Sequence, residues 1–203
     1  MGRNEKRKRE TREKIISSAR EVFKEYGYHG TSVSKVMEQA DLGHGTFYQH
    51  FKNKDQLLSE IFKDFEKKLE EYSMDKISKE ERNIEKRIHV GIRSVLFFYN
   101  EYKDVLSMLT TAMTANEEFK KIGDNIQKIL SAKAVRDYRW SVKNGLCRDI
   151  DQDVAMMCIV NIIQGAGEEI RMNNYSEEDL EKLATNITKV CFYAFFEASE
   201  IPE

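Results

Sequence analysis

Proline, glycine and long apolar runs are scarce in this chain of 203 residues, and each scarcity excludes a class of structure. The one proline is Pro202 and only 10 glycines occur, so little in the sequence interrupts a helix or turns a hairpin. No run of about eighteen apolar residues is present, and the first residues lack the apolar segment of a signal peptide. We therefore expect an all-α, soluble protein that crosses no membrane and stays in the cytoplasm.

Cysteine and histidine are also few, and their spacing matches no common catalytic or metal motif. Cys147, Cys158 and Cys191 lack CxxC spacing, which argues against disulfides or zinc and favours small buried residues, with a redox-sensing thiol as the alternative. The 4 histidines show no HExxH spacing, and neither a GxSxG nor a Walker motif occurs. We expect no metal and no cofactor, and an enzyme is the least favoured function.

Charge is distributed unevenly along the chain. The formal net charge is -2, but residues 1–54 hold 12 Lys or Arg against 7 Asp or Glu, leaving 21 against 28 for residues 55–203. A basic N-terminal part on an acidic remainder indicates that only the N-terminal part meets a polyanion. The basic residues at the start are equally consistent with a solvated tail; they are Arg3, Lys6, Arg7, Lys8 and Arg9.

The N-terminal part has the periodicity of three short helices. An apolar stripe over residues 10–26 is followed by Gly27, a residue suited to a left-handed helix end. Thr31 or Ser32 can cap a second helix, and a tight turn over residues 40–43 leads into a third. Three short helices with a four-residue turn between the last two match a helix-turn-helix unit. The expected bounds are 10–26, 31–39 and 44–50.

The remainder of the chain is expected to form longer helices, two of which differ from the rest. A capping box formed by Ser78 and Glu81 opens one of them. The last two are apolar on more than one face, which predicts a four-helix bundle at a homodimer interface; burial within one subunit is the alternative. Gly165 and Gly167 allow another helix to come close. The expected ranges are 54–72, 78–99, 105–113, 117–143, 151–172 and 176–198.

One motif in the predicted helix-turn-helix is specific. It reads Gly45-Thr46-Phe47-Tyr48-Gln49-His50-Phe51 followed by Lys52-Asn53-Lys54, and with it residues 31–57 resemble the TetR family of bacterial repressors. The resemblance implies a DNA-binding domain over residues 1–54. It further implies a larger helical domain over residues 55–203 for ligand binding and dimerisation, joined through a long helix. Asp41 departs from the family's usual glycine in the turn, and Gly43 from its common Ser or Thr cap.

Candidate DNA contacts follow from how a recognition helix enters the major groove. Its N-terminal end leads, so His44, Thr46 and Gln49 are expected to reach base edges, and Gly45 lets the backbone approach DNA closely. Hydroxyls and charge at helix starts suit phosphates. Phosphate contacts are expected from Thr31, Ser32, Ser34 and Lys54, and the resemblance implies them for Tyr48 and His50. Tyr48 as a core aromatic and Thr31 as a simple cap are the structural alternatives.

The family resemblance also implies a small-molecule effector whose binding in the C-terminal domain releases the DNA. Aromatic and methionine side chains at helical spacing could line its pocket or simply form the core. These candidates are Phe98, Tyr102, Met108, Met113, Tyr138, Trp140 and Met156. Asn161 and Gln164 could bind the ligand or pair across the dimer. The predicted function is a repressor that binds a palindromic, double-stranded operator as a homodimer; the alternative is a DNA-bound factor whose C-terminal domain docks another protein.

Overall fold

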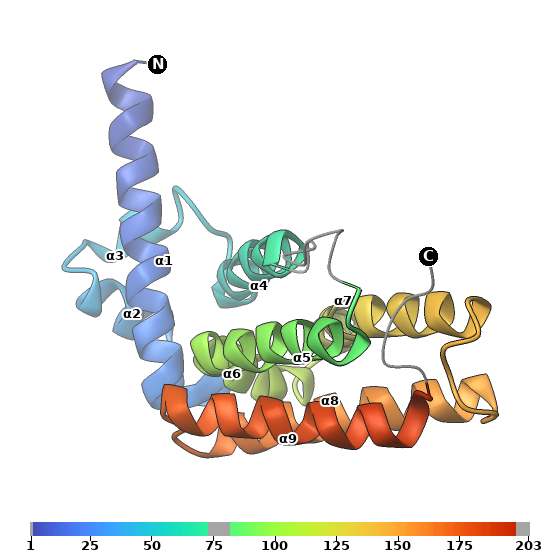
Figure 1. Ribbon diagram of the computed structural model, residues 1–203. Helices are drawn as coiled ribbons and strands as arrows, with labels where there is room; N and C mark the ends of the chain where they lie inside the picture. The colour runs from blue at the N-terminus through green and yellow to red at the C-terminus, as the bar shows by residue number, and fades with distance from the viewer. Residues whose placement is uncertain (1, 73–81, 198–203) are drawn as a thin grey trace. The chain divides into compact units, whose positions relative to one another are not determined.

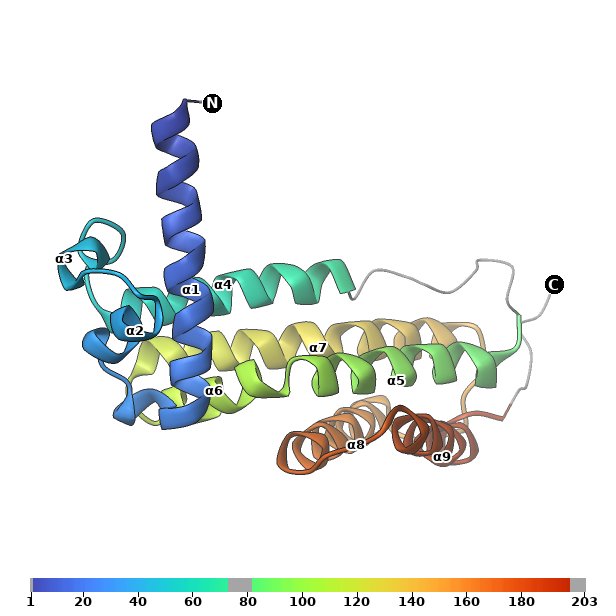
Figure 2. The same ribbon diagram turned by 90° about the vertical axis from the view of Figure 1, so that its left-hand side faces the viewer.

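The computed structural model describes residues 2–72 and 82–197, and over these residues the chain is helical (Figures 1 and 2). No strand forms among them, and an isolated bridge such as that between Cys147 and Phe196 makes no sheet, so the all-α expectation is confirmed. No helix in this part of the chain is long and apolar enough to span a bilayer. The helices are α1 (Arg3–Gly30), α2 (Val33–Gln39), α3 (His44–Phe47), α4 (Lys54–Tyr72), α5 (Ile84–Glu101), α6 (Lys103–Met113), α7 (Glu117–Lys143), α8 (Gln152–Met172) and α9 (Glu177–Phe195).

The chain divides into two compact units. The first comprises residues 1–68 and 104–124, and the second comprises residues 69–103 and 125–203. The first unit therefore contains the three N-terminal helices and most of α4. It also contains α6 and the beginning of α7, which come later in the sequence. The expected functional division at residue 54 stays a prediction, because compactness alone does not assign DNA binding or ligand binding to a segment.

Aromatic side chains from distant parts of the sequence form the core of the first unit. Phe119 of α7 is fully buried and meets Phe62 of α4 edge to face, with ring centroids 5.8 Å apart. It also meets Tyr28 at the end of α1, at 5.6 Å. Burial of each such ring stabilises the fold by roughly 1.5–3 kcal/mol, which fixes α1 and α4 against α7.

In the second unit, α5 packs against both α8 and α9, which lie side by side (Figures 1 and 2). A Cβ added to Gly167 of α8 would collide with the ring of Tyr99 on α5. Only glycine fits there, because any side chain would overlap the ring. Of the two glycines expected to allow close approach, Gly167 does so within the subunit, whereas Gly165 faces open space.

Most predicted helix ends agree with the structure, because local caps define them. Ser32 caps α2 by accepting a hydrogen bond from the Lys35 N–H, and Asp151 and Ser176 cap α8 and α9. Gly145, just past the end of α7, has the positive φ of 66° expected of a helix-ending glycine. The α5 helix begins at Ile84 with Asn83 as its cap; the capping box predicted at residues 78–81 lies outside the described residues.

Two N-terminal helices differ from the expected bounds. The α1 helix begins at Arg3 rather than near residue 10, with ion pairs one turn apart, such as Lys6–Glu10, along the added length. It also continues to Gly30 across a kink at Gly27, whose φ is 64°. The α3 helix ends at Phe47 rather than near His50, because tighter turn hydrogen bonds such as Gln49 N–H to Thr46 carbonyl replace the α-helical ones.

Candidate functional site

The turn between α2 and α3 sets the direction of α3. Asp41 has a φ of 48°, the left-handed conformation that Asp tolerates better than most residues. The Leu42 N–H donates to the Met37 carbonyl, which closes the end of α2. Gly43 then precedes α3, and its carbonyl accepts from the Thr46 N–H at 2.9 Å. The two departures from the family pattern are therefore compatible with a tight turn.

The α3 segment has one buried aromatic residue and an otherwise polar, open surface. Phe47 is 0% exposed, whereas the neighbouring Tyr48 is 58% exposed, so Tyr48 is no core residue. His44, Gly45 and Gln49 are also exposed, and Thr46 is half-buried. A Cβ added at Gly45 would meet no protein atom within 4 Å, so packing within the chain gives no reason for glycine there. The candidate base contacts thus share one accessible segment.

Thr31 and Lys54, both expected at phosphates, are engaged with the protein itself. The Thr31 hydroxyl is buried and donates to the Gly27 carbonyl at 2.7 Å, whereas Ser32 and Ser34 are exposed. The Lys54 ammonium donates to the carbonyls of Tyr28 at 2.9 Å and Thr31 at 3.1 Å. An ammonium has three N–H donors, so one stays available for a phosphate. These contacts hold the start of α4 beside the end of α1.

His50 lies half-buried just after α3, in a positively charged environment. Burial is the main cause that lowers its pKa below the ordinary value, followed by the charges of Lys8 and Arg12 on α1. Its Nδ1 atom is buried without a hydrogen-bond partner among the described residues. The imidazole is therefore neutral at pH 7, and a neutral imidazole still offers one N–H donor to a phosphate.

Comparison with known proteins identifies the helix-turn-helix segment. The family model "Bacterial regulatory proteins, tetR family" matches residues 15–61, from the packed part of α1 through the first turns of α4. This segment is a helix-turn-helix of the TetR family. The relatives that share this segment are transcriptional regulators.

Individual TetR-family relatives extend the likeness over more of the chain. The HTH-type regulator YdgC of Bacillus subtilis is 21% identical over 91% of this chain and 92% of the relative. The fatty acid metabolism regulator protein of Bacillus subtilis is 40% identical, but over only 38% of this chain and 42% of the relative. The first likeness spans both compact units, whereas the second is limited to part of the chain.

Solved structures share the fold at low sequence identity. A tetR-family regulatory protein from Rhodococcus RHA1 gives a TM-score of 0.73 at 16% identity, covering 95% of this chain and 98% of that chain. FadR from Bacillus subtilis, solved in complex with stearoyl-CoA, gives a TM-score of 0.70 at 24% identity, covering 88% of this chain and 96% of that chain. The arrangement of an N-terminal helix-turn-helix and a helical C-terminal part is thus that of the TetR family.

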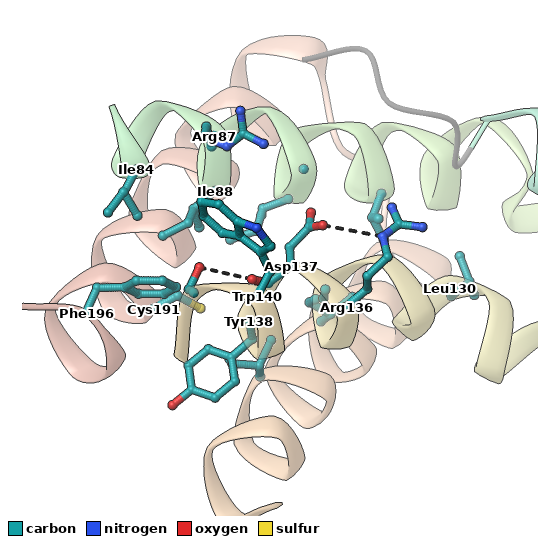
Figure 3. Close-up of a pocket in the computed structure, with 17 residues that line it drawn as sticks. Ile84, Arg87, Ile88, Leu130, Arg136, Asp137, Tyr138, Trp140, Cys191 and Phe196 are labelled. Atoms are coloured by element: carbon teal, nitrogen blue, oxygen red, sulfur yellow. Dashed lines mark hydrogen bonds and ion pairs between the residues drawn. The ribbon is translucent and has the colours of Figure 1, made fainter. Parts of the chain in front are cut away.

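The second unit contains a pocket of about 290 Å³ (Figure 3). The pocket lies among α5, α7, α8 and α9, and most of its lining is apolar. Polar groups come mainly from α7, where the Arg136 guanidinium lies 3.6 Å from the Asp137 carboxylate and the Ser141 hydroxyl donates to the Asp137 carbonyl. The aliphatic lining includes Ile84, Ile88, Ile92 and Val95 of α5 with Ile159 and Ile163 of α8.

The expected ligand contacts are only partly gathered at this pocket. Tyr138 and Trp140 line it, whereas Asn161 is exposed on α8 and donates to the Met157 carbonyl. The aliphatic lining residues were missed, since on a helix the periodicity of a pocket wall is the same as that of a core. The remaining candidates are absent from the lining: Phe98, Tyr102, Met156 and Gln164 in the second unit, and Met108 and Met113 in the first.

Cys147 and Cys191 both lie in the second unit. Burial raises the pKa of the Cys147 and Cys191 thiols to about 11, so both stay protonated at neutral pH and are weak nucleophiles.

Large apolar side chains are exposed on α8 and α9, where a globular surface normally carries polar ones. They are Val154, Met157 and Met172 on α8 with Val190 and Tyr193 on α9.

Proposed function

We propose that this TetR-family chain is a repressor that binds a palindromic operator as a homodimer and is released by a small molecule in the α5–α9 pocket. The observation that carries DNA binding is the α3 segment, which buries Phe47 and exposes His44, Gly45 and Gln49 at the end of a tight turn. A short helix held by one aromatic anchor presents its remaining side chains outward, as major-groove reading requires.

In this proposal one set of residues reads the base sequence, and another set binds phosphates and supplies affinity. Gln49 suits a bidentate contact to adenine, and Thr46 offers a hydroxyl and a methyl group to thymine. Tyr48, His50, Ser32, Ser34 and Lys54 contact phosphates, which position the protein without reading sequence. For the buried Thr31 the proposal is restricted to its backbone N–H, because the hydroxyl already donates within the chain.

Homodimer formation through α8 and α9 would cover their exposed apolar side chains. Val154, Met157 and Asn161 follow one another at spacings of three and four, so they share one face of α8. Val190 and Tyr193 share a face of α9 in the same way. A second copy of the chain is the self-complementary partner that such a face suits, and a twofold axis matches a palindrome with half-sites a whole number of helical turns apart.

The pocket supports an effector with a long aliphatic portion. Its lining is chiefly apolar, with aliphatic side chains as the largest group, and its volume of about 290 Å³ lies near the lower end of small-molecule sites, roughly 300–1,000 Å³. FadR of Bacillus subtilis, which shares the fold, was solved with stearoyl-CoA. A fatty acyl compound is therefore the effector class that we propose. It acts only if it binds the DNA-free state more tightly than the DNA-bound state.

Footprinting tests the DNA-binding part of this proposal. The purified protein is incubated with the DNA that flanks its own coding region, with excess competitor DNA at moderate and raised salt. A protected palindrome supports the proposal, and Gln49→Ala is expected to change the preference between base pairs. Protection without sequence preference would contradict the repressor assignment and favour a DNA-bound factor that docks a protein partner.

Release by an acyl compound tests the effector part separately. Stearoyl-CoA is titrated into the protein–DNA complex, with coenzyme A alone as the control for the headgroup. We expect stearoyl-CoA to release the DNA and coenzyme A to have no effect. Equal release by both compounds, or by neither, would contradict an effector held by its aliphatic portion.

A further inference from the structure

The first helical turns of α1 contribute no buried side chain to the protein. The buried residues of α1 begin at Ile15, and in the extension of twelve residues 3–14 before it only Thr11 and Arg12 are half-buried, Arg12 through its ion pair with Glu60 of α4. At 1.5 Å per residue this extension is roughly 18 Å long. Both ribbon views show α1 continuing past the level of α3 within the same compact unit (Figures 1 and 2).

The extension is strongly basic, and its acidic side chains are largely engaged. Residues 3–14 hold seven basic and three acidic side chains. Glu10 pairs with Lys6, Glu13 pairs with Arg9, and the Glu5 carboxylate accepts from the Gly2 N–H. Lys8 forms no ion pair with any residue that the structure describes. A positive charge without an internal counterion is available to an external anion.

Lys8 lies on the side of α1 that faces the DNA-reading segment. It continues the stripe of Arg12, Ile15 and Ala19 by one helical turn. The Arg12 guanidinium lies 5.0 Å from the centre of the Phe51 ring, and the Phe51 ring centre is 6.4 Å from that of His50. The Lys8 charge is close enough to His50 to disfavour its protonation. The Lys8 charge therefore lies on the same side of the protein as the end of α3.

We propose that the α1 extension is a second DNA-contacting element, in which Lys8 binds a phosphate beyond the base pairs that α3 reads. This inference rests on the proposed DNA-binding function. A recognition segment in a major groove about 12 Å wide has a phosphate backbone on each side, and an extension of roughly 18 Å reaches past one of them. Positive charge that continues the DNA-reading surface in this direction is complementary to the phosphates there.

Lys6 provides a matched control on the same helix. It lies two residues from Lys8, so the two side chains point about 200° apart around the helix axis. Lys6 also pairs with Glu10 at 3.9 Å. Lys6→Gln and Lys8→Gln remove the same charge from the same helix. A diffuse basic tail would weaken DNA binding equally in both variants, whereas a contact through one face of the helix would not.

The test measures binding to a mixed-sequence duplex of about three helical turns, roughly 30 base pairs, between about 50 and 200 mM salt. Each phosphate contact contributes about 0.9 to the slope of log K against log salt. For a dimer with two Lys8 contacts, Lys8→Gln is expected to lower the slope by about 1.8, and Lys6→Gln to change it little. Helix content and the melting temperature are expected to be unchanged, since both side chains are exposed.

The outcomes distinguish this inference from the proposed function on which it rests. A lower slope for Lys8→Gln, restored in Lys8→Arg, supports the phosphate contact. Equal slopes for Lys6→Gln and Lys8→Gln, with normal DNA binding by the unmodified protein, would overturn the α1 contact alone. No binding of the duplex by the unmodified protein at low salt would overturn the proposed function and this inference with it.

Discussion

Lys54 places its ammonium group 4.3 Å from the centre of the Tyr28 ring and 2.9 Å from the Tyr28 carbonyl oxygen. The Tyr28 hydroxyl in turn donates to the Asp55 carboxylate at 2.7 Å. Two consecutive residues of α4 thus bind both ends of one residue of α1. Lys54 was predicted as a phosphate contact only, and the structure adds a role in holding the helix-turn-helix together.

Lys54→Met is expected to reduce both stability and DNA affinity. A cation–π contact stabilises by about 0.5–2 kcal/mol, and its loss also removes the donor for two carbonyls. We expect the free energy of unfolding to fall by about 1–2 kcal/mol, measured by urea denaturation. The exposed Lys52→Met is the control and should leave stability unchanged. If Lys54→Met weakened DNA binding at unchanged stability, the structural role would be wrong.

DNA affinity is expected to increase as the pH falls below about 6.5. In the free protein, burial and then the charges of Lys8 and Arg12 lower the pKa of His50. A bound phosphate favours the imidazolium and raises that pKa, so the complex takes up a proton and low pH favours it. The dissociation constant should be measured between about pH 8 and pH 5.5.

Variants assign this pH dependence to one histidine. His50→Gln is expected to remove it, whereas His89→Gln, a change on α5 in the second unit, keeps it. Protonation of His50 has the opposite sign for stability. Because its pKa is lower in the folded than in the unfolded chain, low pH favours unfolding, and the stability contribution is lost as pH falls through the folded pKa. A pH-independent affinity would contradict a phosphate contact by the protonated imidazole.

Substitution of Gly91 is expected to separate stability from effector binding. Gly91 of α5 lines the pocket, and a Cβ added there meets no atom within 4 Å. Gly91→Ala should stabilise the helix by about 0.5–1 kcal/mol, and Gly91→Phe should fill the pocket and abolish DNA release by stearoyl-CoA. Gln127→Phe, at an exposed position of α7 outside the pocket lining, is the control. Release that survives in Gly91→Phe would place the effector elsewhere.

Two glycines on α8 test the packing of one subunit against the packing of a dimer. Gly167→Ala brings a Cβ into collision with the Tyr99 ring and is expected to cost about 1–3 kcal/mol of stability. The Cβ of Gly165→Ala meets no atom within 4 Å in the single chain, so any weakening of the dimer must come from contact with a second copy. Denaturation measures the first effect, and sedimentation of the dimer over a dilution series measures the second. Unchanged dimerisation of Gly165→Ala would exclude a close helix contact at that position.

Local signals explain why much of the fold could be predicted from the sequence. Asp151 and Ser176 cap helices through bonds to residues two or three positions away, and Gly145 ends one through its own φ. Such interactions are complete within a few residues, so they are visible in the sequence. The helix-turn-helix motif is equally local, since its turn and its buried Phe47 lie within one short segment.

Contacts between distant residues could not be predicted in this way. The aliphatic pocket residues, such as Ile88 and Ile159, have the periodicity of ordinary core residues, and only the packing of four helices separates the two cases. The start of α7 joins the first unit because Phe119 packs on Tyr28 and Phe62, which are far from it in the sequence.

The sequence by itself thus determined the helices, the helix-turn-helix and the candidate residues along it, because caps, glycines and a short motif act over one or two helical turns. Only the tertiary structure decided which side chains are free to act. The Thr31 hydroxyl donates to the Gly27 carbonyl, the Lys54 ammonium donates to the Tyr28 carbonyl, and Gly167 packs against the Tyr99 ring. A side chain's availability depends on every group packed around it, and only the folded chain brings those groups together.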